Sequence, residues 1–239
     1  MKKTIAAILS IIFALSLIVV LFLTSLDIVI YGDMPGWFVS ECVKYDTLSQ
    51  VGIEEDDLAQ VTTDMFEYLR NNRDSLADIT ATINGVPDTP YFNEKECLHM
   101  ADCQKLFIAG YAIRRYCIIA CVVILLVLIL MFRKNISEVL HSLAVGTLAA
   151  TISFTAIAAI LAALIAANFN KYFTLFHLIF FDNDLWLLDP TKDRLLMIMP
   201  TGYFIDCVKY IGGIFAAFLI ILLVLSIVRL RIEKHKHHE

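Results

Sequence analysis

Four long stretches of this 239-residue chain contain no Asp, Glu, Lys, Arg or His, namely residues 5–26, 116–132, 142–170 and 210–228. A helix rises about 1.5 Å per residue, so roughly 20 apolar residues cover the ~30 Å hydrocarbon core of a bilayer. Ion pumps and proton-coupled transporters normally carry ionisable side chains at mid-membrane, which argues against both classes here. The stretches predict an all-α membrane protein with four transmembrane helices.

The chain also lacks the short motifs of several enzyme classes. It contains no G-x-S-x-G elbow, H-E-x-x-H motif, P-loop or G-x-G-x-x-G fingerprint. A serine-nucleophile hydrolase is therefore unsupported, and nothing suggests a cofactor. No C-x-x-C pair suggests zinc. Cys97 and Cys103 lie on one expected helix, about 9 Å apart and on different faces, so they cannot pair with each other, whereas Cys42 could pair with either.

The distribution of charge predicts the orientation of the four helices. The first apolar stretch, of about 22 residues, is too long for a signal-peptide core of roughly 7–15 residues, and no A-x-A site follows, so we expect an uncleaved anchor. The segments rich in Lys and Arg should be cytoplasmic. They contain Lys2 and Lys3, Arg133 and Lys134, and Arg229, Arg231, Lys234 and Lys236.

Two segments should then face outward, and the first is strongly acidic. Residues 27–110 hold sixteen Asp and Glu against five Lys and Arg, which disfavours nucleic acid as a partner of that face. The segment is long enough to fold as a mainly helical extracellular cap. The expected organisation is transmembrane helix 1 with a cytoplasmic N-terminus (1–26), the cap (27–110), transmembrane helix 2 (111–132), a cytoplasmic loop (133–141), transmembrane helix 3 (142–170), an extracellular interfacial segment with an aromatic and Asp motif (171–209), transmembrane helix 4 (210–228) and a cytoplasmic tail (229–239).

Local signals predict several elements in the outer segments. Residues 54–69 have the period of an amphipathic helix, and residues 79–86 could form a short strand or hairpin arm next to the Asn84-Gly85 turn signal. Asn93 and Glu96 form a capping box that starts a helix running into the second span. Asp189-Pro190 is typical of a helix start. In the third span, small residues predict close helix packing: Ala159, Ala163 and Ala167 recur at four-residue spacing, with Gly146 and Ser153 nearby.

Two of the six histidines flank a span boundary on the outer side. His99 lies before the second span and His177 just after the third, so the topology lets them converge near the outer interface. Asp102 follows His99 by three residues, on the same helix face, and could fix the imidazole tautomer. An alternative is a metal site formed by both histidines, Asp102 and one further carboxylate. These residues do not have the sequence spacing of a known metal-binding motif. The candidate carboxylates are Asp182, Asp184, Asp189 and Asp193.

Two segments resemble the motifs of a bacterial four-span family, the lipoprotein intramolecular transacylases. The first is FHLIFFDNDLWLLDPTKDRLLMIMP, residues 176–200, and the second is CLHMADCQKLF, residues 97–107. The number of spans and the sizes of the loops also agree, whereas residues 27–93 match least. The residues that carry the resemblance in the first segment and just after it are Phe176, His177, Phe180, Phe181, Asn183, Trp186, Asp189, Asp193, Pro200, Tyr203 and Phe204.

The resemblance implies a reaction. Enzymes of this family act on diacylated bacterial lipoproteins, whose N-terminal cysteine carries a diacylglyceryl group, and move the sn-2 acyl chain to the α-amino group of that cysteine. The product is the N-acyl S-monoacylglyceryl (lyso) form. The resemblance also implies a multi-pass location in the cell membrane, contact with membrane lipids, and a catalytic pair that matches His99 and His177.

The two histidines suit such a reaction chemically. The amine must lose a proton and the departing glyceryl oxygen must gain one, and imidazoles can do both. We expect His99 to be the base, oriented by Asp102, although the reverse assignment stays open. Supporting roles are expected for Asp102, Asn183, Trp186, Asp189 and Asp193, and a lipid-binding surface from Tyr172, Phe173, Phe176, Phe180, Phe181, Tyr203 and Phe204. No metal is required. The alternatives are a membrane scaffold that binds a partner and a metal-dependent lipid hydrolase.

Overall fold

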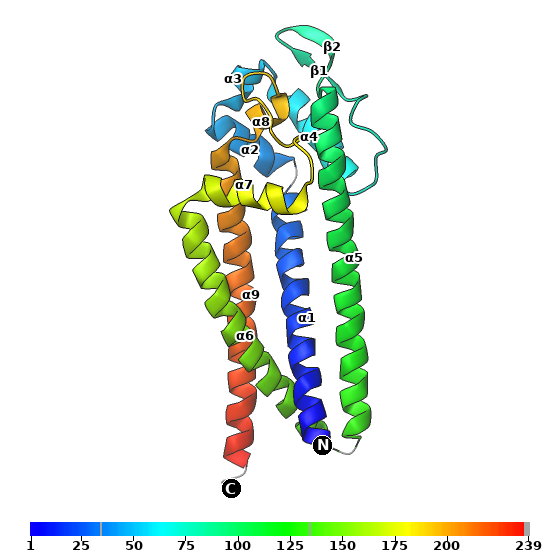
Figure 1. The fold of residues 1–239 in the computed structure, drawn as a ribbon, viewed down its shortest axis with the longest axis vertical. Coiled ribbons are helices and arrows are strands. Elements are labelled where there is room, and N and C mark those ends of the chain that lie inside the picture. The colour runs from blue at the N-terminus through cyan, green and yellow to red at the C-terminus, as the bar shows by residue number, and fades with distance from the viewer. Residues whose placement is uncertain (34, 134, 237–239) are drawn as a thin grey trace. The chain divides into compact units, whose positions relative to one another are not determined.

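The computed structural model describes residues 1–33, 35–133 and 135–236. Lys134 and the last three residues of the predicted tail therefore lie outside the described residues. The described residues form nine helices and one β-hairpin (Figure 1). In chain order these are α1 (Lys2–Tyr31), α2 (Gly36–Lys44), α3 (Thr47–Val51), α4 (Glu55–Leu69), β1 (Thr80–Ile83), β2 (Val86–Pro90), α5 (Glu94–Met131), α6 (Ile136–Ala167), α7 (Phe169–Phe180), α8 (Arg194–Ile198) and α9 (Thr201–Lys236).

Four of these helices, α1, α5, α6 and α9, are long and apolar enough to cross a bilayer. Each contains a stretch of mean hydropathy between 2.4 and 3.1. The predicted fold class, an all-α membrane protein with four spans, is therefore confirmed. The expected continuity of the second span with the helix before it is also confirmed, because α5 runs unbroken through 38 residues.

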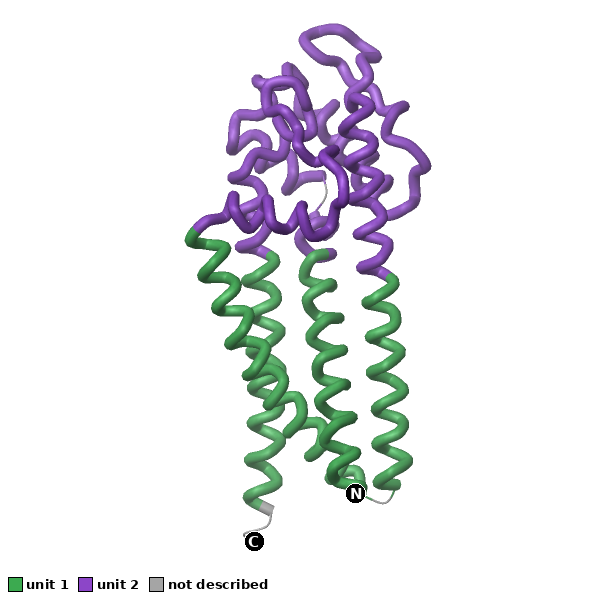
Figure 2. Tube along the Cα trace, in the orientation of Figure 1, with its two compact units in different colours: residues 1–26, 112–167, 211–239 green, residues 27–111, 168–210 purple. Residues whose placement is uncertain are grey.

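The chain divides into two compact units, drawn in different colours in Figure 2. Unit 1 comprises Met1–Leu26, Ala112–Ala167 and Ile211–Glu239, and it holds the apolar parts of the four long helices. Unit 2 comprises Asp27–Tyr111 and Asn168–Tyr210, and it holds the two outer segments predicted from the sequence. The second outer segment thus folds together with the first rather than separately.

Two helices of unit 1 approach each other closely at a glycine. A Cβ placed on Gly146 of α6 would lie 2.5 Å from the Cβ of Ser10 and 2.9 Å from its carbonyl oxygen on α1, so only glycine permits this contact. Gly146 was among the small residues expected to pack closely, whereas the alanines Ala159, Ala163 and Ala167 are exposed. The prediction therefore holds at Gly146 and fails at the alanines, because a small side chain permits close packing without deciding which part of a helix makes the contact.

The core of unit 2 is formed by α2, α4, α8 and the first turns of α9. Helix α4 confirms the predicted amphipathic helix, with Leu58, Val61 and Met65 each no more than 1% exposed. All six cysteines are free, so the disulfide left open for Cys42 is not formed. The Cys42 thiol instead donates to the carbonyl oxygen of Ile198 in α8, at 3.5 Å.

The hairpin in unit 2 follows from its turn residues. Asn84 and Gly85 have φ values of 51° and 77°, the left-handed conformation that a two-residue hairpin turn requires. β1 and β2 pair antiparallel, with Thr80 opposite Pro90 and Ile83 opposite Val86. The predicted strand is therefore the first arm of a hairpin whose second arm begins where the prediction ended.

The helix predicted at Asp189-Pro190 begins later, with α8 at Arg194. The Asp189 carboxylate accepts hydrogen bonds from the backbone N–H and the hydroxyl of Thr191, at 2.9 and 2.6 Å, which closes a local turn. An Asp side chain bonded two residues ahead competes with helix formation. The predicted helix start was therefore wrong by four residues, because Asp193 rather than Asp189 holds the N-cap position.

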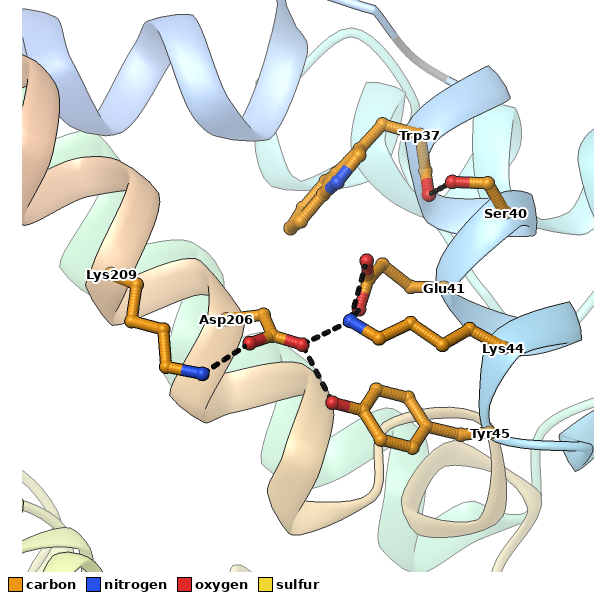
Figure 3. Close-up of polar contacts among 7 residues, drawn as sticks. All are labelled: Trp37, Ser40, Glu41, Lys44, Tyr45, Asp206 and Lys209. Carbon is orange, nitrogen blue, oxygen red and sulfur yellow. Dashed lines mark hydrogen bonds and ion pairs between the residues drawn. The ribbon is translucent and has the colours of Figure 1, made fainter.

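An ion-pair network that the sequence did not single out ties α2 to α9 (Figure 3). Asp206, a residue only 6% exposed, accepts hydrogen bonds from Lys44, from the Tyr45 hydroxyl at 2.6 Å and from Lys209 at 2.8 Å. Lys44 also donates to both oxygens of Glu41, at 3.1 and 3.2 Å. The hydrogen bonds from Lys209, Lys44 and Tyr45 hold the pKa of the Asp206 carboxyl well below its usual range.

Replacing Asp206 by Asn should destabilise unit 2. The loss is about 1–2 kcal/mol, the range for a charge-assisted hydrogen-bond network with solvent-exposed lysines. Because the pKa of Asp206 is lowered on folding, its contribution is present above the unfolded value near 3.8 and is lost as the pH falls below it. Thermal unfolding of purified D206N in detergent should therefore differ most from the parent near pH 7 and converge with it below about pH 4. The exposed Asp74, changed to Asn, is the matched control, and an equal loss in both variants would contradict the assignment.

Candidate active site

The first turns of α5 are held by the predicted capping box. The Asn93 side chain accepts from the Glu96 N–H at 3.0 Å, and the Glu96 carboxylate accepts from the Asn93 N–H at 2.7 Å. The second Glu96 oxygen accepts from the N–H of Leu195 in α8, at 2.7 Å. Asn93 also donates to Asp193 at 2.7 Å, and Asp193 accepts from the N–H of Asp189 at 2.6 Å. These bonds fix the part of α5 that carries His99 against the segment that follows α7.

Helix α7 presents the second histidine near its C-terminal end. Asn168 caps its start by accepting from the N–H of Lys171 at 3.1 Å, and the chain becomes extended at Phe181. The Phe181 N–H donates to the His177 carbonyl oxygen at 2.8 Å, which closes the last turn. His177 is the only buried residue among those of this helix that the structure describes.

The structure brings the two histidine rings together. Their centroids are 6.1 Å apart with the ring planes 32° to each other, and the residues are 8% and 7% exposed. The Phe181 ring contacts both, at 5.4 Å from His99 and 5.5 Å from His177. The convergence that the topology allowed is therefore observed in unit 2.

Aromatic side chains surround His177 on several sides. Trp186 stacks on the imidazole at 4.8 Å and 30°, and Phe173 and Phe176 lie 4.5 and 5.4 Å from it. The remaining predicted aromatics are farther out: Phe180 packs on Phe176 and Phe204 on Phe173, Tyr172 contacts Lys171, and Tyr203 lies in the core against Phe38. The prediction that Tyr203 lines this surface was wrong, because the same turn of α9 is needed to close the core.

The ring nitrogens have distinct partners. Nδ1 of His177 lies 2.7 Å from the carbonyl oxygen of Phe173, which can only accept, so Nδ1 carries the hydrogen. Nε2 of a neutral His177 is therefore unprotonated. Nε2 of His99 lies 3.6 Å from the sulfur of Cys103, and Nδ1 of His99 is buried with no hydrogen-bond partner among the described residues. The Trp186 indole N–H is likewise buried without a partner in the described part of the chain.

Asp102 does not make the expected bond to His99. One of its carboxylate oxygens accepts from Lys105 and the other from Asn183, both at 2.8 Å, and neither oxygen bonds His99 in the part of the chain that the structure describes. The i, i+3 spacing places His99 and Asp102 on one face of the helix. It does not determine which nearby side chain the Asp102 carboxylate bonds. Asp102 instead holds the loop between His177 and Trp186 to α5 through Asn183.

Burial sets the protonation state of both imidazoles. Loss of solvation lowers the pKa of His99 from 6.5 to about 4, with His177 adding to the effect and the Asp102 charge opposing it. Burial also lowers the pKa of His177, against the hydrogen bond to Phe173. For Cys103, burial raises the thiol pKa to about 12. Near neutral pH the site therefore holds two neutral imidazoles and a neutral thiol. A neutral imidazole can both accept a proton and donate one.

Cys103 was not among the residues expected near His99. The i, i+4 spacing within α5 was the available signal, because residues four apart on a helix are neighbours. A metal site would need at least three ligating side chains close together. No group of three or more His, Cys, Asp or Glu side chains with the spacing of metal ligands occurs within residues 1–33, 35–133 and 135–236.

Comparison with known proteins agrees with this architecture. The model of the Lit family, described as lipoprotein intramolecular transacylase Lit, matches residues 11–204. A comparison with curated protein sequences found no match. Solved structures of the membrane integral lipoprotein intramolecular transacylase Lit from Bacillus cereus are similar in fold. One has a TM-score of 0.67 at 18% identity and covers 97% of this chain and 95% of its own.

Two further structures of the Bacillus cereus protein carry a substitution of one histidine. The variant with alanine has a TM-score of 0.71 at 18% identity, covering 97% of this chain and 96% of that one. The variant with arginine has a TM-score of 0.71 at 17% identity, covering 98% and 95%. The family model spans most of the chain, and the four spans agree with a membrane-integral fold. This chain thus belongs to the Lit family of lipoprotein intramolecular transacylases and is a membrane enzyme.

Proposed function

We propose that the enzyme transfers the sn-2 acyl chain of a diacylglyceryl-cysteine lipoprotein to the α-amino group of the same cysteine. The nitrogen forms a bond to the ester carbonyl carbon, the bond from that carbon to the glyceryl oxygen breaks, and one proton passes from nitrogen to oxygen. The product is the N-acyl S-monoacylglyceryl lipoprotein. The observation that carries the proposal is the pair of buried neutral imidazoles, 6.1 Å apart, on elements contributed by distant parts of the chain.

His177 is the general base in this proposal. Its Nδ1–H is committed to the Phe173 carbonyl oxygen, so Nε2 holds the lone pair that accepts a proton from the amine. Stacking on Trp186 limits rotation of the ring. This assignment reverses the expectation from the sequence, which rested on a bond between Asp102 and His99.

His99 stabilises the oxygen side of the reaction. We assign His99 the tautomer in which Nε2 accepts from the Cys103 thiol and Nδ1 carries the hydrogen, since Nδ1 is buried without a partner in the described chain. A buried donor without a partner is costly, and a substrate oxygen would satisfy it. A neutral imidazole donor can stabilise negative charge on the carbonyl oxygen. The proton that His177 takes from the amine then passes to the departing glyceryl oxygen, so both imidazoles are neutral again at the end of the reaction.

The chemistry needs little more than correct positioning. Amine and ester belong to one molecule, and holding them in a reactive geometry supplies about 7–11 kcal/mol of the barrier reduction. Phe173, Phe176 and Phe181 offer an apolar surface next to the histidines for an acyl chain. Asp102 and Asn183 position the loop that brings Trp186 over His177.

We further infer that both termini are cytoplasmic and that unit 2 faces the outside of the cell membrane. The Lys and Arg residues near the termini support this orientation. Diacylated lipoproteins would then reach the site from the outer leaflet. A C-terminal reporter enzyme that is active only outside the cell should be inactive when fused to the full chain.

Purified enzyme and a synthetic S-diacylglyceryl lipopeptide test the reaction. Transfer within one molecule leaves the total mass unchanged, so tandem mass spectrometry should find the acyl chain on nitrogen, and an amine-reactive tag should no longer label the peptide. The matched control is the same peptide with an acetylated α-amine, which has no acceptor and should remain unchanged. Release of free fatty acid from either peptide would identify a hydrolase and overturn the proposal.

The pH dependence of the rate follows from the lowered histidine pKa values. The α-amine has a reference pKa of about 8, so the rate should rise with pH up to about that value. Because burial lowers the pKa of His177 below its ordinary value of 6.5, its Nε2 is mostly unprotonated above that pH. The rate should therefore show no inflection from this residue above pH 6.5. Initial rates measured from pH 5 to 9 check this. A single inflection near 6.5 that is independent of the substrate amine would contradict it.

A further inference from the structure

Unit 1 contains a pocket of its own, whereas the histidine pair belongs to unit 2. A pocket of about 370 Å³ lies between α1, α6 and α9, within the range of roughly 300–1,000 Å³ that small-molecule sites occupy. It is lined on α1 by residues at i, i+4 and i+8 and on α6 by residues that share one helix face. The lining residues used below are Lys3, Ala7 and Ile11 of α1 and Glu138, Val145 and Ala149 of α6.

One end of this pocket carries two charges of opposite sign that do not neutralise each other. Glu233 is already paired, with His141 at 2.7 Å and Arg229 at 3.5 Å. By contrast, neither Lys3 nor Glu138 has an ion-pair partner among the described residues, although both line the same pocket. An unpaired ammonium and an unpaired carboxylate on facing helices match a ligand that carries both charges.

Besides Lys3 and Glu138, the pocket is lined by the polar residues His141, Ser142 and Glu233, and its other lining residues are apolar or glycine. Along both α1 and α6, the lining changes from charged to apolar in the same direction. On α1 the charge of Lys3 is followed by Ala7 and Ile11, and on α6 the charge of Glu138 is followed by Val145 and Ala149. Both helices begin at the same end of unit 1 (Figure 2). The charged ends of the two walls therefore coincide, which is the arrangement that an amphiphile with one headgroup and an apolar chain requires.

We propose that this pocket binds a phospholipid whose headgroup carries a primary amine, such as phosphatidylethanolamine. Lys3 binds the phosphate and Glu138 accepts hydrogen bonds from the ammonium group, while an acyl chain lies along Ala7, Ile11, Val145 and Ala149. A quaternary ammonium is favoured by aromatic rings, and none of the described residues lining the pocket is Phe, Tyr or Trp. A phospholipid that is anionic and lacks an amine would place its charge beside Glu138 without satisfying it.

Native mass spectrometry of the delipidated full chain in detergent tests the proposal. The lipids compared are phosphatidylethanolamine, phosphatidylcholine and phosphatidylglycerol with identical acyl chains. Phosphatidylethanolamine should bind about tenfold more tightly than the other two, the effect of one charge-assisted hydrogen bond. Equal binding of the three lipids, or preference for phosphatidylglycerol, would overturn it.

Variants assign the selectivity to the two charged residues. Lys3→Gln and Glu138→Gln should each weaken binding of phosphatidylethanolamine about tenfold, whereas Lys3→Arg should retain it. Lys2→Gln removes the same charge one residue away, outside this pocket, and should bind like the parent chain. Binding by Lys3→Gln or Glu138→Gln equal to that of Lys2→Gln would refute the site. Acyl transfer in detergent should be unaffected in all four, so this result is independent of the proposed reaction.

Discussion

Replacing His177 by alanine should lower the rate of acyl transfer by about two to four orders of magnitude, the usual contribution of a general base. The substitution removes the Nε2 lone pair that the hydrogen bond from Nδ1 to the Phe173 carbonyl keeps available. It also removes the ring on which Trp186 stacks. The measurement is the initial rate at which the N-acyl product forms from the synthetic lipopeptide, read by tandem mass spectrometry.

Two variants separate loss of the base from general damage. His177→Gln keeps a side-chain amide but supplies no base, so it should be as inactive as the alanine variant. His235→Ala removes a histidine that is exposed near the end of α9 and should leave the rate unchanged. A His177→Gln enzyme with near-parent activity would exclude His177 as the base.

The second large effect is expected at His99. Alanine there should lower the rate about 10²- to 10³-fold, the range for removing one donor to a developing oxyanion. In the proposed tautomer the donor is the Nδ1–H of His99, and this nitrogen is buried without a partner among the described residues. In contrast to His177, which acts as a base, His99 acts as a neutral N–H donor. It is neutral near pH 7 because burial lowers the pKa of its imidazole to about 4.

Glutamine distinguishes the roles of the two histidines. Its amide N–H can replace a donor, so His99→Gln should recover part of the rate lost in His99→Ala, whereas His177→Gln should recover none. The opposite pattern, with rescue at His177 and none at His99, would reverse the assignment. Parallel circular dichroism spectra of the four proteins establish that they are folded.

Much of the fold followed from patterns within short windows of sequence. The absence of charge over four long stretches predicted the four spans, and the period of residues 54–69 predicted α4. The Asn93 and Glu96 capping box was predicted correctly because both of its hydrogen bonds are local. The same kind of argument failed at Asp189, where a local turn to Thr191 competes with a helix start.

The active site could be predicted from the sequence only in part. The histidines could be recognised from their places beside the spans and from the resemblance of the segments around them to a known family. Their immediate partners could not, since Asp102 faces Asn183 across 81 residues of sequence and Tyr203 is taken into the core against Phe38. The sequence spacing of Asp102 and Tyr203 does not predict these contacts.

The sequence by itself determined that this chain crosses a membrane four times and places two histidines at the ends of spans, because hydrophobicity and helical rise are local properties. Only the tertiary structure decided which ring nitrogen is free, which charges are neutralised and which aromatics reach the histidines. Those outcomes depend on hydrogen bonds and ring contacts between segments far apart in the chain, whose partners are selected by packing.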